Sequence, residues 1–214
     1  MTTEVLKDLE RAILEYNGES AVSVAKKVVE EGIDVNTALE TVTNAIRQIG
    51  DGFGREELWL PELVAASDVM LKVIAILEET AKKSGQPRKG PGNVVIGTVL
   101  GDIHTTGKDM VGALLTAAGF IVRDLGVNVT SEQFLDALKE HNADVLAMSA
   151  LMTTTMTRMK DVIDDIKEAG LRDQVKVMIG GAAITEEYAK DIGADGFDPT
   201  APGAVQLAKR LLGV

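Results

Sequence analysis

The 214-residue sequence has no cysteine, few aromatic residues and no long apolar segment. The lack of cysteine excludes disulfides, thiolate zinc sites and cysteine nucleophiles. Aromatic residues make up only 3% of the chain, so its cores must be built from Val, Ile, Leu, Ala and Met. No apolar run is long enough to cross a bilayer, and the acidic N-terminus does not look like a signal peptide. We therefore expect no membrane partner and a cytoplasmic location.

Positive charge is also scarce, because 22 Lys and Arg stand against 33 Asp and Glu, for a net charge of −11. A nucleic-acid partner needs clustered basic residues, so we expect none. The sequence has no G-x-x-x-x-G-K-[ST], no G-x-G-x-x-G after a strand and no G-x-S-x-G, which leaves nucleotide-phosphate cradles and a serine nucleophile unsupported. Two histidines without cysteine cannot build a closed zinc site of the common types.

Residues 1–85 have helical periodicity and predict a small antiparallel bundle of four helices. Gly18 and Gly32 mark the ends of the first two helices, and Pro61 suits the first position of the fourth. The predicted apolar stripes are Leu6, Leu9, Ile13 and Tyr16; Ala21, Ala25 and Val28; Val35, Leu39, Val42, Ile46 and Ile49; and Leu63, Ala66, Met70, Val73, Ile74, Leu77 and Ala81.

The segment from Gly50 to Pro61 joins the third and fourth predicted helices and carries three glycines, Phe53 and the single tryptophan, Trp59. It is either a loop whose aromatic residues pin it to the bundle, or a flap that presents Phe53, Trp59 and Leu60 to something outside the bundle.

A second Pro- and Gly-rich segment, residues 86–92, cannot continue a helix and predicts a linker between two domains. Beyond it, residues 93–214 alternate strand and helix signals, which is typical of an α/β, doubly wound parallel sheet. The expected order of the five strands is the flavodoxin-like (Rossmann-like) order 2-1-3-4-5. The strand candidates are 94–100, 120–123, 145–149, 175–179 and 196–197, and the helix candidates are 108–118, 131–141, 155–169, 185–192 and 201–212.

In that order a ligand crevice lies where the loops leaving the first and third strands meet. The first loop holds Asp102 and His104, and a carboxylate on one imidazole nitrogen makes the other nitrogen a better metal ligand. Asp102 is alternatively a cap for the next helix, and the run from Thr153 to Thr155 is alternatively an N-cap. The other histidine, His141, is predicted to be a surface or C-terminal capping residue.

These motifs together resemble the signature of cobalamin-binding domains. D-x-H-x-x-G is found at 102–107, S-x-L at 149–151 and Gly-Gly at 180–181. The bundle, with Phe53 and the run from Leu58 to Leu63, resembles the helical cap module of the same family. The likeness spans essentially the whole chain. It is to the corrinoid proteins of anaerobic methyltransferase systems, which use methanol, methylamines, methoxylated aromatics or betaines, and to the cobalamin-binding region of methionine synthase.

The resemblance implies that His104 coordinates cobalt from the lower face of cobalamin or a related corrinoid, and so displaces the cofactor's own base. It implies that Asp102 bonds the other nitrogen of His104 and that Thr155 completes this relay. Thr105 and Thr106 stand where the family commonly has Asp-Ile, and they flank the ligand. Here Asp109 also replaces the family's Asn.

The family pattern also implies a slot for the displaced nucleotide tail of the cofactor. Its lining residues are Ser149, Leu151 and Thr153, and the residues that leave room for the tail are Gly107, Gly180 and Gly181. Phe53 and Leu60 are expected to cover the upper face of the corrin and shield the methyl group.

The implied function is methyl carriage, in which the cofactor alternates between cob(I)alamin and methylcobalamin. The expected partners are a substrate-specific methyltransferase, an acceptor methyltransferase serving coenzyme M or tetrahydrofolate, and a reductive activation protein. The chain is then the corrinoid subunit of a methyltransferase system and does not act alone. Alternatives are a cobalamin-dependent sensor, a subunit of a carbon-skeleton mutase and a flavodoxin-like signalling domain without corrinoid. The expected absence of a DNA-binding segment before the bundle disfavours the sensor, and the presence of the bundle disfavours the mutase.

Overall fold

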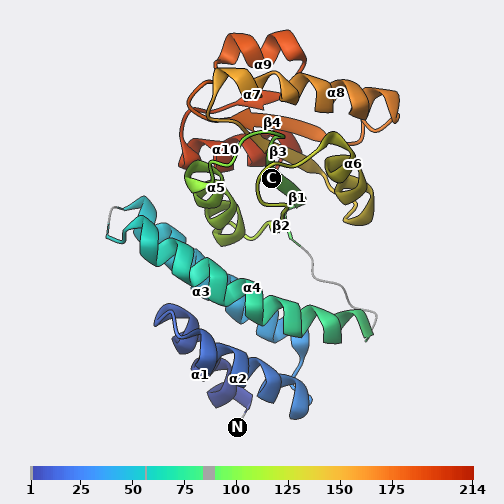
Figure 1. Cartoon of the computed structure of the whole chain (residues 1–214). Coiled ribbons are helices and arrows are strands. Elements are labelled where there is room, and N and C mark those ends of the chain that lie inside the picture. Colours follow the sequence, from blue (N-terminus) through green and yellow to red (C-terminus); the bar gives the residue numbers. More distant parts are fainter. Residues whose placement is uncertain (1, 56, 84–89) are drawn as a thin grey trace. The chain divides into compact units, whose positions relative to one another are not determined.

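The computed structural model describes residues 2–55, 57–83 and 90–214, with the backbone only at 54, 60, 78 and 81–83, and the chain forms two units (Figure 1). The first unit contains the N-terminal helices, and the second begins at Gly90 and contains the sheet. Most of the predicted linker 86–92 lies outside the described residues. None of the helices in the described ranges is long and apolar enough to cross a membrane.

The first unit contains the four predicted helices, α1 (Thr2–Leu14), α2 (Gly18–Glu30), α3 (Val35–Gly54) and α4 (Leu60–Lys83). The helices begin where side chains satisfy free backbone amides: Asn17 accepts from the amide of Ser20 before α2, and Asp34 accepts from the amide of Thr37 before α3. Their apolar stripes pack together, and the buried residues include Leu9, Ile13, Ala25, Val42, Ile46, Leu63 and Met70.

The connection between α3 and α4 is shorter than predicted, because α3 continues through Phe53 to Gly54. Gly52 is buried inside the helix, and a Cβ added there would lie 3.0 Å from the side chain of Leu58. Leu58 therefore packs back onto the end of α3. Trp59, in contrast, is 76% exposed, so this aromatic residue does not pin the segment to the bundle.

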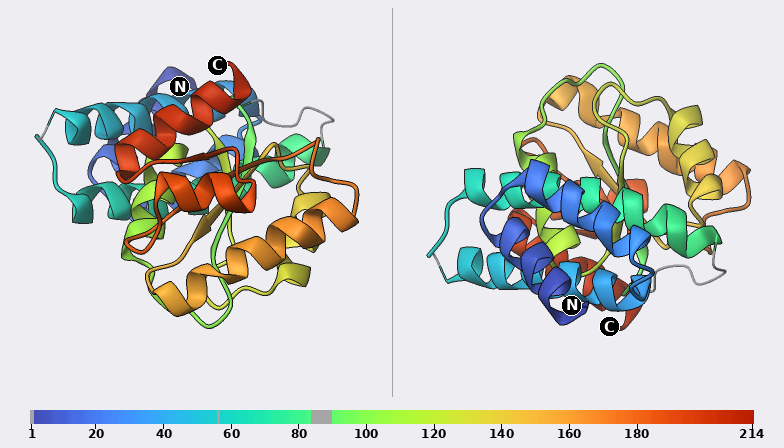
Figure 2. Two further views of the ribbon diagram at one scale, coloured as in Figure 1. Left: turned by 90° about the horizontal axis from the view of Figure 1, so that it is seen from above. Right: turned by 90° about the horizontal axis from the view of Figure 1, so that it is seen from below.

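The second unit is a five-stranded parallel sheet in the order β2-β1-β3-β4-β5, which confirms the predicted order. A core of buried side chains joins one face to α6, α8 and α9, while α5 and α10 lie on the other face (Figures 1 and 2). The strands are β1 (Asn93–Thr98), β2 (Ile121–Asp124), β3 (Val145–Ser149), β4 (Lys176–Gly180) and β5 (Gly196–Phe197). The helices are α5 (Thr106–Ala117), α6 (Ser131–Glu140), α7 (Thr153–Met156), α8 (Arg158–Glu168), α9 (Glu186–Ile192) and α10 (Ala201–Leu212).

The single helix predicted over 155–169 is in fact two helices, α7 and α8. The carbonyl of Met156 accepts a hydrogen bond from the hydroxyl of Tyr188 at 2.8 Å. The amide of Lys160 bonds instead to the carbonyl of Thr157, three residues back. This contact across the fold interrupts the regular i to i−4 pattern, and nothing in the local sequence predicts it.

Candidate cofactor site

The register of the sheet brings the ends of three strands to one level. Thr98 pairs with Ser149, and Ser149 pairs with Gly180, so these residues form one row at the carboxyl end of the sheet. The pairing continues past the strands, because the amide of Val99 donates to the carbonyl of Ser149 and the amide of Ala150 donates to that of Gly180. The loops that leave β1, β3 and β4 therefore begin side by side, as ligand sites of open α/β sheets do.

A single buried carboxylate joins two of these loops. The Oδ1 atom of Asp102 lies 2.7 Å from Nδ1 of His104 and also accepts from the His104 amide. Its Oδ2 atom accepts from the hydroxyl of Thr155 at 2.7 Å and from the amides of Leu151 and Met152 at 2.9 and 3.4 Å. The predicted meeting of the loops after the first and third strands is thus confirmed.

Asp102 is ionised at neutral pH although no part of its side chain reaches solvent. Burial on its own raises the pKa of this carboxyl group, but the hydrogen bonds from Thr155, His104 and the amide of Leu151 outweigh burial and hold the pKa far below its usual range. Because an ionised carboxylate only accepts hydrogen bonds, the proton of a neutral His104 ring lies on Nδ1. The lone pair of that ring then lies on Nε2.

The backbone around His104 is fixed by polar contacts, although the imidazole itself is 47% exposed. The hydroxyl of Thr98 donates to the carbonyl of His104 at 3.0 Å. The backbone amide of Gly101 donates to the side-chain oxygen of Asn128, and the backbone amide of Asn128 donates to the carbonyl of Asp102. An exposed imidazole on a fixed backbone, with Nδ1 already engaged, is arranged to present Nε2 outward.

The capping alternatives do not describe these residues. Asp102 bonds the loop that precedes α7 and does not cap α5. The residue before α7 is Met152, whose side chain makes no capping bond, and Thr155 turns its hydroxyl to Asp102 and to the carbonyl of Met152. His141 occupies the C-cap position of α6, as predicted.

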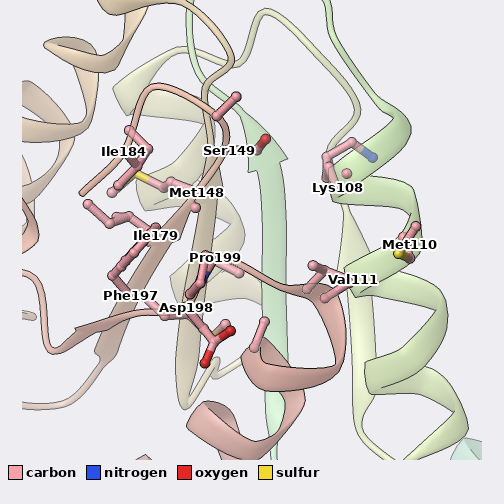
Figure 3. Close-up of a pocket in the computed structure, with 18 of the residues that line it drawn as sticks. Lys108, Met110, Val111, Met148, Ser149, Ile179, Ile184, Phe197, Asp198 and Pro199 are labelled. Atoms are coloured by element: carbon pink, nitrogen blue, oxygen red, sulfur yellow. The ribbon is translucent and has the colours of Figure 1, made fainter. Parts of the chain in front are cut away.

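A cavity of about 440 Å³ opens beside His104, over the carboxyl ends of β1, β3 and β4 (Figure 3). Its wall is mostly apolar or small, with Ile96, Met110, Val111, Ala147, Met148, Met178, Ile179, Ile184, Phe197 and Ala204 among the lining residues. Six predicted site residues belong to the lining: His104, Gly107, Ser149, Leu151, Gly180 and Gly181.

The remaining predicted residues lie elsewhere. Thr105, Thr106 and Thr153 are exposed and are not among the cavity-lining residues. Phe53 is half-buried in the last turn of α3, in the other unit. Leu60 begins α4, and its side chain lies outside the described residues.

The glycines of the predicted motifs are needed for different physical reasons. Gly181 has a φ of +124°, and a Cβ there would lie 1.9 Å from the carbonyl oxygen of Ala150, so the close approach of two backbone segments requires it. A Cβ on Gly107, in contrast, would meet nothing within 4 Å. Packing within the protein does not explain a glycine at 107, and the open space it borders is the cavity.

Two charged residues of the lining were missed in the sequence. Lys108 is buried, and its ammonium group pairs with Asp109 at 2.6 Å and with Asp124. Its place directly after Gly107 was a usable signal. Asp198 follows β5, which has only two residues. So short a strand gives a weak sequence signal, and the residue after it was therefore not predicted as part of the site.

Two models of B12 binding domains match the chain, one over residues 92–206 and the other over residues 5–78. The chain belongs to the B12-binding protein family. Its cofactor is therefore a corrinoid, and the alternative of a signalling domain without corrinoid is wrong.

Related corrinoid proteins match over nearly their whole length. The trimethylamine corrinoid protein of Methanosarcina barkeri is 40% identical over 99% of this chain and 98% of its own. The dimethylamine corrinoid protein 2 of Methanosarcina acetivorans is 42% identical over 98% and 96%. Among solved structures, a chain of the methanol:cobalamin methyltransferase complex of Methanosarcina barkeri superposes with a TM-score of 0.83 at 28% identity, covering 98% of this chain and 80% of that one.

The residues around the cavity fit a corrinoid. Within the described ranges, no three His, Asp or Glu side chains come together in a way that could hold a metal ion. A metal at His104 must therefore bring most of its ligands with it, as the cobalt of a corrin does with its four ring nitrogens. The site supplies what remains, which is one oriented imidazole and an apolar cavity beside it.

Proposed function

We propose that this protein is a corrinoid methyl carrier that accepts a methyl group from one methyltransferase and delivers it to another. The observation that carries the proposal is the chain of contacts from Thr155 through Asp102 to His104 at the mouth of an apolar cavity. The bound corrinoid supplies the chemistry, since its cobalt centre takes up and releases the methyl group. The names of the relatives, with trimethylamine, dimethylamine and methanol among them, support a small methylated compound as the methyl donor.

In this proposal His104 is the lower axial ligand of cobalt, through Nε2. Asp102 keeps the proton on Nδ1 of that ring, and Thr155 donates to the same carboxylate and keeps it ionised. An imidazole bonded to a carboxylate is a stronger electron donor than a free one, so this arrangement favours ligation by His104 over the cofactor's own base.

The cavity is then the slot for the displaced nucleotide tail. Ser149 and Leu151 line it, and Gly107 and Gly180 leave its wall open. Thr153 flanks the slot from outside the lining, and Thr105 and Thr106 flank the ligand loop.

The helical residues 1–85 act as a cap over the upper face of the corrin, with Phe53 and Leu60 shielding the methyl group, while 93–214 hold the cofactor. Each partner has to reach the corrin, so the cap must uncover it during the cycle. The partners are a substrate-specific methyltransferase, an acceptor methyltransferase serving coenzyme M or tetrahydrofolate, and a reductive activation protein. The match of a B12 binding domain model to residues 5–78 supports the assignment of the cap role to the helical unit.

Reconstitution with hydroxocobalamin tests the ligand assignment. We expect wild-type protein and His141→Ala to bind it with the spectrum of a corrinoid whose own base is detached, and His104→Ala to lose this form. His141 is the matched control because it is the other histidine and caps α6 away from the cavity. The corrinoid is then reduced to the cobalt(II) state in protein labelled with ¹⁵N-histidine. Its electron paramagnetic resonance spectrum should show hyperfine splitting by one ¹⁵N nucleus. Failure of the wild-type protein to bind, or an unchanged spectrum in His104→Ala, would refute the assignment.

A further inference from the structure

Asp198 is the one acidic residue among the described residues that line the cavity. It follows β5, and in Figure 3 it lies across the cavity from Lys108 and Met110 of α5. The ammonium group of Lys108 is bound to Asp109 and Asp124, so it does not neutralise Asp198. Asp198 thus places the one carboxylate of the described lining in a wall that is mostly apolar or small.

The position of this carboxylate is fixed. Its Oδ1 atom accepts from the amide and the hydroxyl of Thr200 at 2.9 and 2.8 Å. Thr200 also caps α10, because its hydroxyl accepts from the amide of Gly203. A Cβ on Gly203 would lie 2.0–2.3 Å from the three carboxylate atoms of Asp198, so the group rests directly against the first turn of α10.

The other oxygen, Oδ2, has no hydrogen-bond donor within the part of the chain that the structure describes. Its neighbours in the sequence, Phe197 and Pro199, are apolar and also line the cavity. A carboxylate oxygen beside apolar surface is stabilised when it accepts a hydrogen bond, and an occupant that replaces water there must supply the donor.

We propose that Asp198 is a specificity-determining residue, whose Oδ2 accepts a hydrogen bond from an N–H or O–H group on the nucleotide tail of the corrinoid. The inference rests on the proposed function, because it places the tail in this cavity. The phosphodiester of the tail is an anion and is repelled by the carboxylate. The donor is therefore a ribose hydroxyl, present in every complete corrinoid, or an amino or hydroxyl group on the tail base, present in only some of them.

The affinities of the protein for three corrinoids test the proposal. They are measured at pH 7.5 by equilibrium dialysis with detection by visible absorbance. Cobinamide has no nucleotide tail, hydroxocobalamin has a ribose and a dimethylbenzimidazole without N–H or O–H donors, and the adenine analogue adds an exocyclic amine. The measured quantity is the affinity for each complete corrinoid divided by the affinity for cobinamide. Cobinamide reports the integrity of the fold in every variant, so this ratio isolates the tail.

In Asp198→Ala we expect the ratio to fall roughly 10- to 100-fold, as for loss of a hydrogen bond to a charged group. Asp198→Asn should restore part of it, because the amide oxygen still accepts. Asp191→Ala, an exposed carboxylate on α9, is the matched control and should leave the ratio unchanged.

The comparison of hydroxocobalamin with the adenine analogue distinguishes a ribose hydroxyl donor from a donor on the tail base. A fall for hydroxocobalamin and the adenine analogue alike identifies the ribose hydroxyl, and a fall for the adenine analogue alone identifies the base amine. Unchanged ratios for both ligands in Asp198→Ala overturn the role of Asp198 and leave the carrier function intact. If the wild-type protein binds none of the three corrinoids, the proposed function itself is overturned, and this inference with it.

Discussion

At the scale of single residues, the site depends on Asp102. It is fully buried, it bonds the side chains of His104 in its own loop and of Thr155 in α7, and its hydrogen bonds hold its pKa low in spite of burial. A buried ion is tolerated only where its hydrogen bonds are complete, so the two loops stabilise the carboxylate and the carboxylate in turn joins the loops.

Asp102→Asn should lower the free energy of unfolding of the apo protein by about 2 kcal/mol at pH 7, because an amide in place of the carboxylate meets N–H donors with its own NH2 group. Asp136→Asn, on the exposed face of α6, is the control and should change it by less than about 0.5 kcal/mol. Urea denaturation measures both, and equal midpoints for the two variants would contradict the account.

The same carboxylate sets an expected pH dependence. Its pKa is lower in the folded than in the unfolded state, so near its ordinary value of 3.8 the unfolded chain binds more protons. The stabilisation is complete above that value and is lost as the pH falls below it towards the folded pKa. The stability gap between wild type and Asp102→Asn should therefore narrow below about pH 4. Urea titrations from pH 7 to pH 3 measure the gap, and a constant gap would count against an ionised Asp102.

At the scale of elements, backbone contacts decide where helices break and where glycines are needed. The hydroxyl of Tyr188 separates α7 from α8 by occupying the carbonyl of Met156. The backbone of Ala150 leaves no room for a side chain on Gly181, whereas Gly107 borders open space.

Tyr188→Phe should cost about 1 kcal/mol of stability, because it removes one hydrogen bond from a partly buried carbonyl. Tyr16→Phe, at the other tyrosine of the chain, should have little effect. Chemical denaturation of the two variants in parallel is the measurement, and an equal loss in both would show that the contact with Met156 is unimportant.

Gly181→Ala and Gly107→Ala should behave in opposite ways. The first should destabilise the apo protein by at least about 2 kcal/mol, through its positive φ and its clash with Ala150. The second should leave stability unchanged or raise it by up to about 1 kcal/mol, because alanine favours α5, and should weaken corrinoid binding by narrowing the cavity. Thermal melting and dialysis separate the two effects, and tight binding by Gly107→Ala would place the tail elsewhere.

At the scale of the whole molecule, the sequence was sufficient for the class of both units and for the order of the strands. Periodicity identifies four helices and five βα repeats, and the right-handed crossover rule then fixes the order β2-β1-β3-β4-β5. Contacts between distant residues could not be predicted in the same way. The break before α8 depends on Tyr188, 32 residues from Met156. The family pattern assigns Gly181 to ligand space, and its close approach to the backbone of Ala150, 31 positions earlier in the sequence, could not be predicted.

The whole-molecule consequence of the site is stabilisation by the cofactor. A ligand that binds only the folded state at about 100 times its dissociation constant adds about 2.7 kcal/mol. Hydroxocobalamin should raise the melting temperature of wild type and His141→Ala to the same extent, and that of His104→Ala by less. A rise of the same size in all three proteins would show that His104 contributes nothing to binding.

Asp102 and Thr155 are 53 positions apart in the sequence, and the contact between them needs both segments of the chain. Consider a chimera that takes the loop after β1 from one relative and residues 151–155 from another. The first segment has to keep a carboxylate that accepts hydrogen bonds, and the second has to keep a hydroxyl and two backbone amides that donate to it. Engineers who transplant this site into another parallel sheet should therefore move both loops together, with the alignment of Thr98 against Ser149 preserved.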